Sequence, residues 1–545
     1  MITTGGSQPE PAPRVAGQRA ALTEQQQAAP SRPDWVPWLI ALAVFAGYLI
    51  ISLSRYLRLA PGSWDLGIFT EYVKQIAHLD APVVNIRGAG FNLLGDHFQP
   101  IVGLIAPFFL LFPSPATLLV AQALLTAVSV IPVSRAAEAR LGTAAGRMIG
   151  AAYGLSWGLA QMIDFDFHEI AFAVPLLACS LSALLRGRTR AAVLWALPLV
   201  FVKEDQGFTV AALGMVMMFS SVSRRPALAG GPAYAPDTAR NEVFWGGLIL
   251  ICWGILWSAL AIIVIIPHFN AAHQYPYWTD GGALRPGGHG AGLGTVASQL
   301  GASWLAKLRT TLLILLPVGF LALGSPLGLV ALPSLLLRFV STNSSYLGDG
   351  FHYNATVMPI IFLAAVDTLA RFRARRQVAG EAGPAAGGCS PSRRSARSGD
   401  QGVQGGRPPG QVLRTATGWV APAVMLALAV VILPKFPLSG VWQPPTYQIS
   451  PHVQAEDAAM AQVPAGTTVE ATLTMVAPLA ARDDTYWIGN AGNPAPQYIV
   501  FDATDSGWSP PPSNPLTFVE QRHNGTRYRT VFTDNGVYVF RRISG

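Results

Sequence analysis

The chain has 545 residues, of which 51% are hydrophobic and only 12% are charged, and its mean hydropathy is +0.38. This composition excludes an ordinary soluble protein and is typical of a polytopic membrane protein. The net charge of +8 comes mainly from Lys and Arg in short loops and in one linker, where they set membrane orientation, so it is not evidence for nucleic acid. The cysteines, Cys179, Cys252 and Cys389, lie in two apolar spans and one low-complexity segment and build neither a disulfide framework nor a zinc spacing.

Residues 1–35 are rich in Pro, Gln, Ala and Gly without an apolar run, which predicts a disordered cytoplasmic tail rather than a signal peptide. Because a spanning helix needs about 20 apolar residues, about eleven later segments are expected to cross the membrane. These segments lie near residues 36–54, 115–134, 146–163, 170–186, 191–203, 207–222, 243–266, 308–323, 326–340, 355–370 and 416–433.

The apolar run from Ile101 to Phe112 is shorter and is interrupted by proline, so it is either a span or a helix beside the membrane. If it does not span, most of the Arg clusters fall on the side of the N-terminus, and the positive-inside rule makes that side cytoplasmic. The clusters are Arg135/Arg140/Arg147, Arg186/Arg188/Arg190, Arg224/Arg225/Arg240 and Arg371/Arg373/Arg375/Arg376, with Arg55 and Arg58 as the main exceptions. The acidic loops and most histidines then share the outer face.

Residues 36–370 are therefore predicted to form the transmembrane domain, with its first outer loop at 61–100. Residues 371–414 are rich in Gly, Ser, Pro and Arg, which predicts a disordered basic cytoplasmic linker before a last span at 415–434. Beyond the last span the composition becomes that of a soluble domain.

Within residues 435–545, strand patterns occur at 468–473 and 497–501 and helical pieces near 452–461 and 475–481. Asp534-Asn535-Gly536 is a hairpin signal between two further strand patterns. We therefore expect a small extracytoplasmic α/β domain at this end of the chain.

The loop after the first span begins with Ser63-Trp64-Asp65-Leu66-Gly67 and ends with Gly95-Asp96-His97-Phe98-Gln99-Pro100. Between these sequences, apolar side chains recur at helical spacing opposite Glu71, Lys74 and Gln75, which predicts an amphipathic helix along the membrane surface.

Each acidic sequence of this loop has two interpretations. Asp65 could act as a general base on an acceptor hydroxyl, or it could simply cap the helix that follows. Asp96 and His97 could bind a divalent ion or orient an acceptor or phosphate, or they could form a turn before the next membrane segment.

Two Asp, one His and one Glu occur between Asp164 and Glu169, in a short connection between apolar segments where ionisable groups are costly. If this connection is helical, Asp164 shares a face with His168, and Asp166 shares one with Glu169. We favour a functional site over a plain outer loop.

Lys203, Glu204 and Asp205 lie between two short spans, so they are expected below the outer interface, where an ionisable cluster indicates function. Lys203 could bind a lipid phosphate, while the two carboxylates could orient an acceptor or bind a cation. The alternative is a salt bridge that only neutralises itself.

Arg338 and His352 bracket the last outer loop before the linker. Arg338 breaks the positive-inside trend, so it either binds a phosphate or extends its side chain to the interface. His352 is weaker evidence, and the aromatic residues around Tyr275 and Tyr277 are interpreted as a membrane-interface belt.

Together, Trp64-Asp65-Leu66-Gly67, Gly95-Asp96-His97-Phe98-Gln99-Pro100, Phe165-Asp166-Phe167-His168-Glu169 and Lys203-Glu204-Asp205-Gln206-Gly207 resemble a bacterial family of predicted multi-pass membrane proteins of unknown function, which is distantly similar to the GT-C glycosyltransferases. The resemblance spans residues 36 to 370 and continues weakly into the last domain. It implies an outer-facing active site whose first loop carries the catalytic acidic residue, a polyprenyl-phosphate sugar donor, and inversion at the anomeric carbon. GT-C enzymes often pair two acidic residues there, whereas Leu66 follows Asp65 here.

The expected protein is an α-helical polytopic protein of the bacterial inner membrane that transfers a sugar from a polyprenyl-phosphate donor to an extracytoplasmic glycan, lipid or protein. Asp65 is the expected catalytic residue, and Lys203 and Arg338 are expected to hold the donor phosphate. The other expected site residues are Asp96, His97, Asp166, His168, Glu169, Glu204, Asp205 and His352.

Metal use is open, with a divalent cation as the candidate cofactor and Asp96, His97, Asp166 and Glu169 as candidate ligands. Two other functions fit the same pattern. One is a transporter or lipid-handling protein without catalysis, and the other is an assembly or scaffold protein.

Overall fold

The computed structural model describes residues 34–61, 63–222, 237–278, 293–341, 343–381, 418–505, 507–508 and 510–544. The chain divides into two units, Met1–Val36 and Pro37–Gly545, and the second unit carries every site discussed below. The predicted tail up to residue 33, Arg224, Arg225, Cys389 and the linker from residue 382 to 417 lie outside the described residues.

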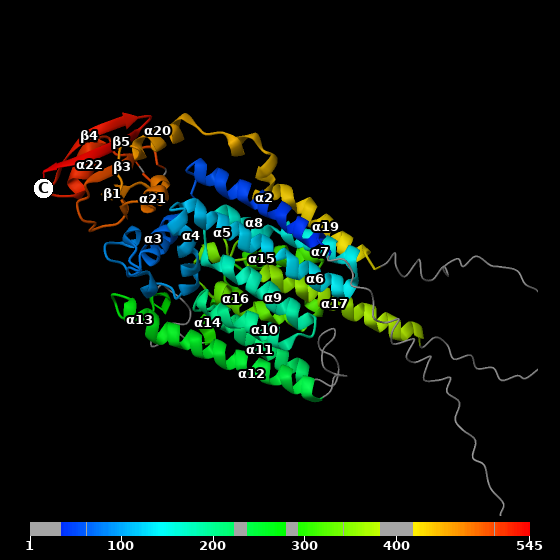
Figure 1. Ribbon diagram of the computed structural model, residues 1–545. Coiled ribbons are helices and arrows are strands. Elements are labelled where there is room, and N and C mark those ends of the chain that lie inside the picture. Colours follow the sequence, from blue (N-terminus) through cyan, green and yellow to red (C-terminus); the bar gives the residue numbers. More distant parts are fainter. Residues whose placement is uncertain are drawn as a thin grey trace, which may run out of the picture. The chain divides into compact units, whose positions relative to one another are not determined.

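Helices dominate the part of the chain up to the last predicted span (Figure 1). The α-helices of this part are α2 (Val36–Leu57), α3 (Asp65–Ala77), α4 (Ala106–Leu111), α5 (Pro115–Val128), α6 (Val130–Leu141), α7 (Thr143–Gly154), α8 (Trp157–Phe165), α9 (Ala173–Leu185), α10 (Thr189–Ala196), α11 (Gln206–Val222), α12 (Asp237–Leu260), α13 (Ile266–Phe269), α14 (Leu293–Gly301), α15 (Trp304–Leu315), α16 (Leu332–Phe339), α17 (Val357–Glu381) and α19 (Val420–Ile432).

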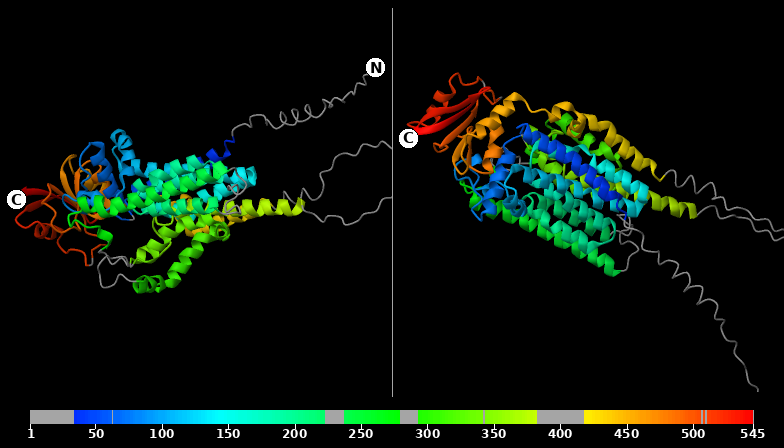
Figure 2. Two further views of the ribbon diagram at one scale, coloured as in Figure 1. Left: turned by 90° about the horizontal axis from the view of Figure 1, so that it is seen from below. Right: turned by 45° about the horizontal axis from the view of Figure 1, so that its top comes forward.

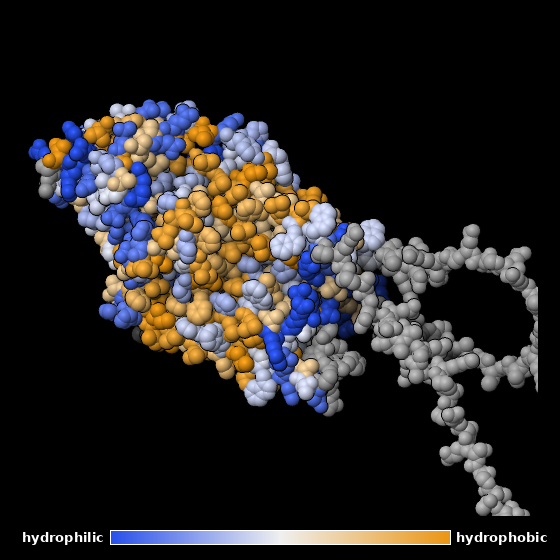
Figure 3. Space-filling model, viewed as in Figure 1, coloured by the Kyte–Doolittle hydropathy of each residue, from blue (hydrophilic) through white to orange (hydrophobic). Residues whose placement is uncertain are grey.

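Three helical stretches of the described chain are long and apolar enough to cross a membrane, namely Val36–Leu57, Pro115–Leu141 and Asp237–Phe269. Shorter apolar helical stretches are Pro100–Leu111, Glu169–Leu185, Thr189–Phe201, Gln206–Val222, Pro326–Phe339 and Val420–Lys435. Hydrophobic residues gather in a broad area over the helices, between more hydrophilic ends, in the face that Figure 3 displays. This arrangement fits a membrane protein, and the number of about eleven spans stays a prediction.

Proline and left-handed residues break some of the predicted spans. The segment predicted at 308–323 is not one helix, because α15 ends at Leu315 and Pro317 and the positive-φ residues Gly319 and Phe320 follow. The run from Ile101 to Phe112 is likewise a 3-10 turn, Pro100–Ile105, followed by the short α4. Its outward side chains, including Leu104 and Phe108, are exposed apolar groups, as expected beside lipid.

Small residues bring two neighbouring helices into close contact. A Cβ at Gly207 would collide with the carbonyl oxygen of Gly254, and a Cβ at Gly214 would collide with that of Gly247. Helices α11 and α12 therefore pack backbone to backbone, which is typical of helix pairs in membranes. This packing fixes the start of α11, directly after Lys203, Glu204 and Asp205.

Among the described residues after the last predicted span, the α-helices are α20 (Pro451–Met460), α21 (Leu473–Ala480) and α22 (Pro515–Arg522). The sheet of this C-terminal part has the order β2-β1-β3-β5-β4, formed by β1 (Thr468–Ala471), β2 (Asp484–Trp487), β3 (Tyr498–Asp502), β4 (Arg527–Asp534) and β5 (Val537–Ser544). Strand β1 pairs in parallel with β2 and β3, while β5 pairs antiparallel with β3 and β4. The predicted α/β domain is present, and its hairpin turns at Asn535 and Gly536, both with positive φ.

This C-terminal domain packs on the first loop, so that α21 lies against α3 (Figures 1 and 2). The Lys74 ammonium donates to the Asp483 carbonyl at 2.6 Å, and the Trp64 and Trp487 rings meet edge to face at 4.7 Å. Helix α3 is thus a helix as predicted, but its apolar side chains pack against protein, and its position along a membrane surface stays a prediction. Residues Leu66 to Val73 are all buried, including the Glu71 carboxylate, because protein covers both faces of the helix.

Gly67 sets the distance between α3 and α21, and replacing it by Ala is expected to lower stability. The added Cβ would lie 2.8 Å from Cγ1 of Val476, and overpacking of this kind typically costs about 1–3 kcal/mol. The thermal midpoint of Gly67→Ala in detergent should therefore fall. Gly301→Ala in α14 is the matched control, since its Cβ would meet nothing within 4 Å. Equal midpoints for the two variants would show that α21 adapts without cost.

Candidate functional site

Asp65 is the first residue of α3, and Ser63 holds its carboxylate. The Ser63 hydroxyl donates to Oδ2 of Asp65 at 2.5 Å. The residue before the helix is Trp64, and no side chain caps the helix there. The interpretation of Asp65 as a helix cap was therefore wrong, and its carboxylate is left to face other groups of the site.

Those groups form a row of side chains with alternating charge. Oδ2 of Asp65 lies 3.8 Å from Nε2 of His168, and Nδ1 of His168 lies 2.6 Å from Oε2 of Glu169. Oε1 of Glu169 then accepts a hydrogen bond from Nζ of Lys203 at 3.1 Å. The Glu169 side chain is fully buried, whereas that of Asp65 is 23% exposed. This row of charged side chains thus leads from an accessible carboxylate to a buried ammonium group.

The charges in this row shift the pKa values of the side chains that form it. Burial alone would lower the pKa of His168, but Glu169 and Asp65 outweigh it and raise the pKa to about 9. Burial would raise the pKa of Asp65, but His168 and the Ser63 hydroxyl bring the net pKa below its ordinary value. At neutral pH, Asp65 is therefore an ionised carboxylate beside an imidazolium.

His352 completes this group as a neutral ring. It stacks on His168 with ring centroids 3.4 Å apart. Burial and then the neighbouring His168 cation hold the pKa of His352 well below its ordinary value. A neutral imidazole thus covers the charged one.

The segment from Asp164 to Glu169 is not helical, so the predicted face-sharing pairs were wrong. Helix α8 ends at Phe165, and Asp166 has a φ of 150°. Asp164 therefore points to Arg55, with a 3.1 Å ion pair, instead of to His168. The Asp166 carboxylate accepts the backbone N–H of Ser63 at 2.9 Å, which ties this segment to the Asp65 loop.

Gln122, a buried residue of α5, holds this segment in place, and the sequence analysis missed it. Its amide nitrogen donates to the Asp166 carbonyl at 2.5 Å, and its amide oxygen accepts the N–H of His168 at 2.8 Å. A lone Gln inside an apolar run was the available signal, because a buried amide needs hydrogen-bond partners.

A second cluster surrounds Glu204. Its Oε1 accepts from Nδ1 of His97 at 2.8 Å and from the Tyr275 hydroxyl at 3.1 Å, and its Oε2 accepts the N–H of Phe98 at 3.1 Å. The Tyr277 hydroxyl lies 2.6 Å from Nε2 of His97. The assignment of these two tyrosines to an interface belt was therefore wrong, since both hydroxyls bind site residues.

The candidate metal ligands do not converge on one point. Asp96 pairs with Arg87 at 3.2 Å and accepts from Tyr277, whereas His97 is engaged by Glu204. Glu169 is held between His168 and Lys203, and Asp166 lies on the side of Ser63. Among the described residues, these four side chains therefore take part in different polar contacts and do not form one set of metal ligands.

A cavity of about 350 Å³ joins the two clusters. Six of the predicted site residues line it, namely His97, Lys203, Glu204, Asp205, Arg338 and His352. Aromatic side chains, including Tyr275, Tyr277, Tyr346 and Tyr353, form much of the remaining wall. Asp65 does not line this cavity, but it reaches the wall through His168 and the stacked His352.

Arg338 is buried at the cavity and donates only to uncharged oxygens. Its guanidinium bonds the carbonyls of Tyr346, Gly348 and Tyr353 and the amide oxygen of Asn354. Among the described residues it forms no ion pair with a carboxylate. These bonds use all five N–H donors of the guanidinium and hold the loop after α16, so Arg338 acts on an anion in the cavity only through its positive charge.

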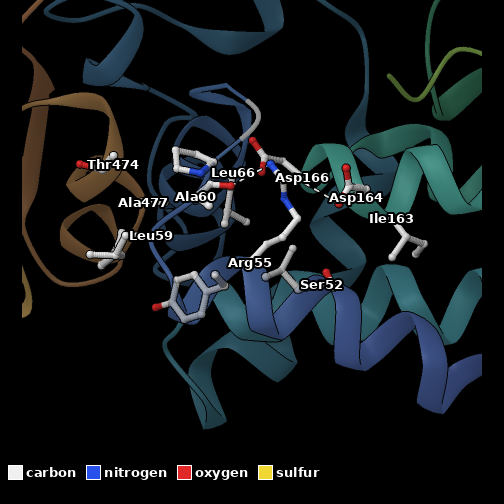
Figure 4. Close-up of a pocket in the computed structure, with 14 residues that line it drawn as sticks. Ser52, Arg55, Leu59, Ala60, Leu66, Ile163, Asp164, Asp166, Thr474 and Ala477 are labelled. Atoms are coloured by element: carbon white, nitrogen blue, oxygen red, sulfur yellow. Dashed lines mark hydrogen bonds and ion pairs between the residues drawn. The ribbon is translucent and has the colours of Figure 1, made fainter. Parts of the chain in front are cut away.

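A smaller pocket of about 20 Å³ lies between α2, the end of α8 and α21 (Figure 4). Arg55 reaches from α2 toward Asp164 and Asp166, and Thr474 and Ala477 of α21 lie on the opposite side. Asp166 thus belongs to this pocket rather than to the large cavity. At this size the pocket holds no more than a water molecule.

Apolar helices around buried ion pairs and a polar cavity define this chain as an integral membrane protein. The family described as "Predicted membrane protein (DUF2079)" matches residues 55–383, and the chain belongs to that family. The predicted family membership is confirmed. No curated protein matches the chain.

Two solved structures of ArnT from Cupriavidus metallidurans are similar to the chain. One, bound to undecaprenyl phosphate, is 13% identical with a TM-score of 0.46, over 92% of this chain and 97% of that one. The other, in the apo state, is 14% identical with a TM-score of 0.48, over 93% and 97%. The oligosaccharyltransferase AglB from Archaeoglobus fulgidus, in complex with an inhibitory peptide and a dolichol-phosphate, is 11% identical with a TM-score of 0.37, over 93% and 74%. These scores are low, and the family match alone assigns the chain.

Proposed function

We propose that this protein is a membrane glycosyltransferase that transfers a sugar from a polyprenyl-phosphate donor to an extracytoplasmic acceptor. The observation that carries the proposal is the large cavity, which Lys203 and Arg338 line together with Glu204 and Asp205. Two cations beside carboxylates can bind a phosphate and still orient a hydroxyl acceptor.

The cavity suits a lipid-linked sugar in two respects. Its volume of about 350 Å³ lies in the range of small-molecule sites, and its tyrosines offer aromatic faces and hydroxyls for a sugar. Its apolar lining, such as Ile170, Phe208 and Leu337, offers contact for the first part of a polyprenyl chain.

In this proposal Asp65 removes the proton of the acceptor hydroxyl as that oxygen attacks the anomeric carbon and the phosphate leaves. An ionised carboxylate is the form that accepts a proton, and the imidazolium of His168 keeps Asp65 in that form. The donor phosphate would bind at Lys203 in the cavity, and because Asp65 lies outside the cavity, the donor sugar would extend past His168 to the exposed edge of Asp65, where the acceptor would enter. Glu169 contacts both His168 and Lys203, so it would orient the imidazolium beside Asp65 and the ammonium group that binds the phosphate.

The same proposal places the site residues and the C-terminal domain on the outer side of the bacterial inner membrane, with the Arg-rich loops in the cytoplasm. It divides the chain into the transmembrane domain at 36–370, the linker at 371–414, the last span at 415–434 and the outer domain at 435–545. Positive-inside charge distribution supports this orientation.

Donor binding and transfer can be tested separately. The purified protein should bind undecaprenyl phosphate in native mass spectrometry and, given a polyprenyl-phosphate sugar and a membrane extract as acceptor source, should release the free lipid phosphate. Binding without sugar transfer would instead favour a lipid-handling protein. Absence of both would contradict the proposal.

The raised pKa of His168 predicts a pH-dependent stability. Because the folded state raises this pKa from 6.5 to about 9, the bound proton stabilises the fold fully below pH 6.5, and this stabilisation is lost as the pH rises through about 9. The free energy of unfolding of the wild type should exceed that of His168→Gln at pH 6 and approach it above pH 9. Denaturation in detergent at several pH values measures the difference. His78→Gln, at an exposed position, should show no such trend.

A further inference from the structure

A separate polar cluster lies in the C-terminal domain, away from the large cavity. His452 and Glu456 are four residues apart on α20, so they share one face of that helix. Asp502 ends β3 beside them, and one ligand atom from each of the three residues lies within 4.8 Å of the other two. A helix and a strand thus bring one imidazole and two carboxylates together.

Each of these side chains has a second nitrogen or oxygen atom, and a hydrogen bond to that atom fixes the orientation of the side chain. Nδ1 of His452 lies 3.1 Å from the Asn535 carbonyl, which can only accept, so Nδ1 carries a proton. Oε1 of Glu456 accepts from the Thr474 hydroxyl, and Oδ1 of Asp502 accepts from the N–H and hydroxyl of Thr504. Partners of this kind are what fix the ligands of metal sites.

The orientation of His452 leaves one close contact, which either a proton on Nε2 or a metal ion would satisfy. Its Nε2 faces Oδ2 of Asp502 at 3.1 Å, and both atoms offer lone pairs when the ring is neutral. Glu456 and Asp502 are 1% and 3% exposed. In the described chain no Lys or Arg forms an ion pair with either carboxylate, and Asp502 pairs with His452.

We propose that His452, Glu456 and Asp502 bind a divalent transition metal, with Zn²⁺ as the best fit. One imidazole and two carboxylates are ligands that Zn²⁺ accepts, and three protein ligands leave one position open. The His452 side chain is 34% exposed, so solvent reaches the site from its side. The metal would join α20 to β3 and, through Thr474, to α21, which packs on the helix of Asp65.

The test uses the full chain, purified in detergent without a polyhistidine tag, stripped with a chelator and dialysed against ZnCl₂. We expect about one Zn²⁺ per chain by elemental analysis and a higher thermal midpoint with Zn²⁺ than without. His452→Gln and Asp502→Asn should lose both the ion and the Zn²⁺-dependent shift. Asp457→Asn, on the exposed face of the same helix, should keep both.

Thr474→Val keeps all three ligands and removes one orienting hydroxyl, so it remains informative if the other variants fold poorly. It should weaken Zn²⁺ binding by about 10-fold or more. A wild type that retains no Zn²⁺ and shows no shift would overturn the proposal and leave an imidazolium–carboxylate pair. Equal Zn²⁺ content in the wild type and His452→Gln would also overturn it.

Discussion

Replacing Asp65 by Asn is expected to reduce sugar transfer by about 10²–10⁴-fold, which is the usual contribution of a positioned general base. Asn has nearly the same shape and can still accept the Ser63 hydroxyl, but it cannot take a proton from the acceptor. The effect should fall on kcat rather than on donor binding, because Lys203 and the cavity are unchanged. Initial rates with purified protein at saturating donor measure it.

Asp80→Asn is the matched control for this variant. Asp80 is an exposed carboxylate of the same loop, so its replacement makes the same charge change without touching the site. Its rate should equal that of the wild type, and undecaprenyl phosphate binding should be unchanged in both variants. Wild-type rates in Asp65→Asn would remove Asp65 from the mechanism, and the carboxylates of the large cavity would then be the candidates.

Local patterns predicted the local structure well. The helix after Asp65, the strands at 468–471 and 498–502 and the hairpin at Asn535 follow from periodicity and turn chemistry, which act over a few residues. The burial of α3 against the C-terminal domain could not be predicted in this way. Its polar side chains are satisfied by distant backbone groups, such as the Asp483 carbonyl that binds Lys74, and periodicity does not register such partners.

The grouping of site residues depended on contacts between distant segments. Lys203, Glu204 and Arg338 were singled out because ionisable groups near a membrane are costly, and they do line one cavity. Which carboxylate pairs with which cation was not accessible, because α8 ends at Phe165 and turns Asp164 toward Arg55.

Tyr275 and Tyr277 illustrate the same limit. From sequence alone, a tyrosine at a membrane interface cannot be distinguished from a tyrosine that donates a hydrogen bond to a buried Glu. Their role emerged from two distances, to Glu204 and to His97. Gln122 was missed for a related reason, since its partners are backbone atoms about forty residues away.

Replacing Lys203 separates donor binding from structural support. Lys203→Met leaves the fully buried Glu169 with His168 as its remaining cationic partner, and breaking a buried pair costs about 3–5 kcal/mol. Its thermal midpoint should therefore fall. Its donor affinity should also fall, by about 10–100-fold, because a hydrogen bond to a charged group contributes about 1.5–3 kcal/mol.

The double variant Lys203→Met/Glu169→Gln distinguishes the loss of stability from the loss of donor affinity. Removing both charges of the pair takes away the unpaired carboxylate, so stability should recover most of the way toward the wild type. Undecaprenyl phosphate binding should stay as weak as in Lys203→Met, because no cation has been restored. Arg190→Gln, which removes an 89% exposed cation, should change neither quantity. If the double variant regains full donor affinity, Lys203 only stabilises Glu169, and Arg338 becomes the remaining cation of the cavity for the donor phosphate.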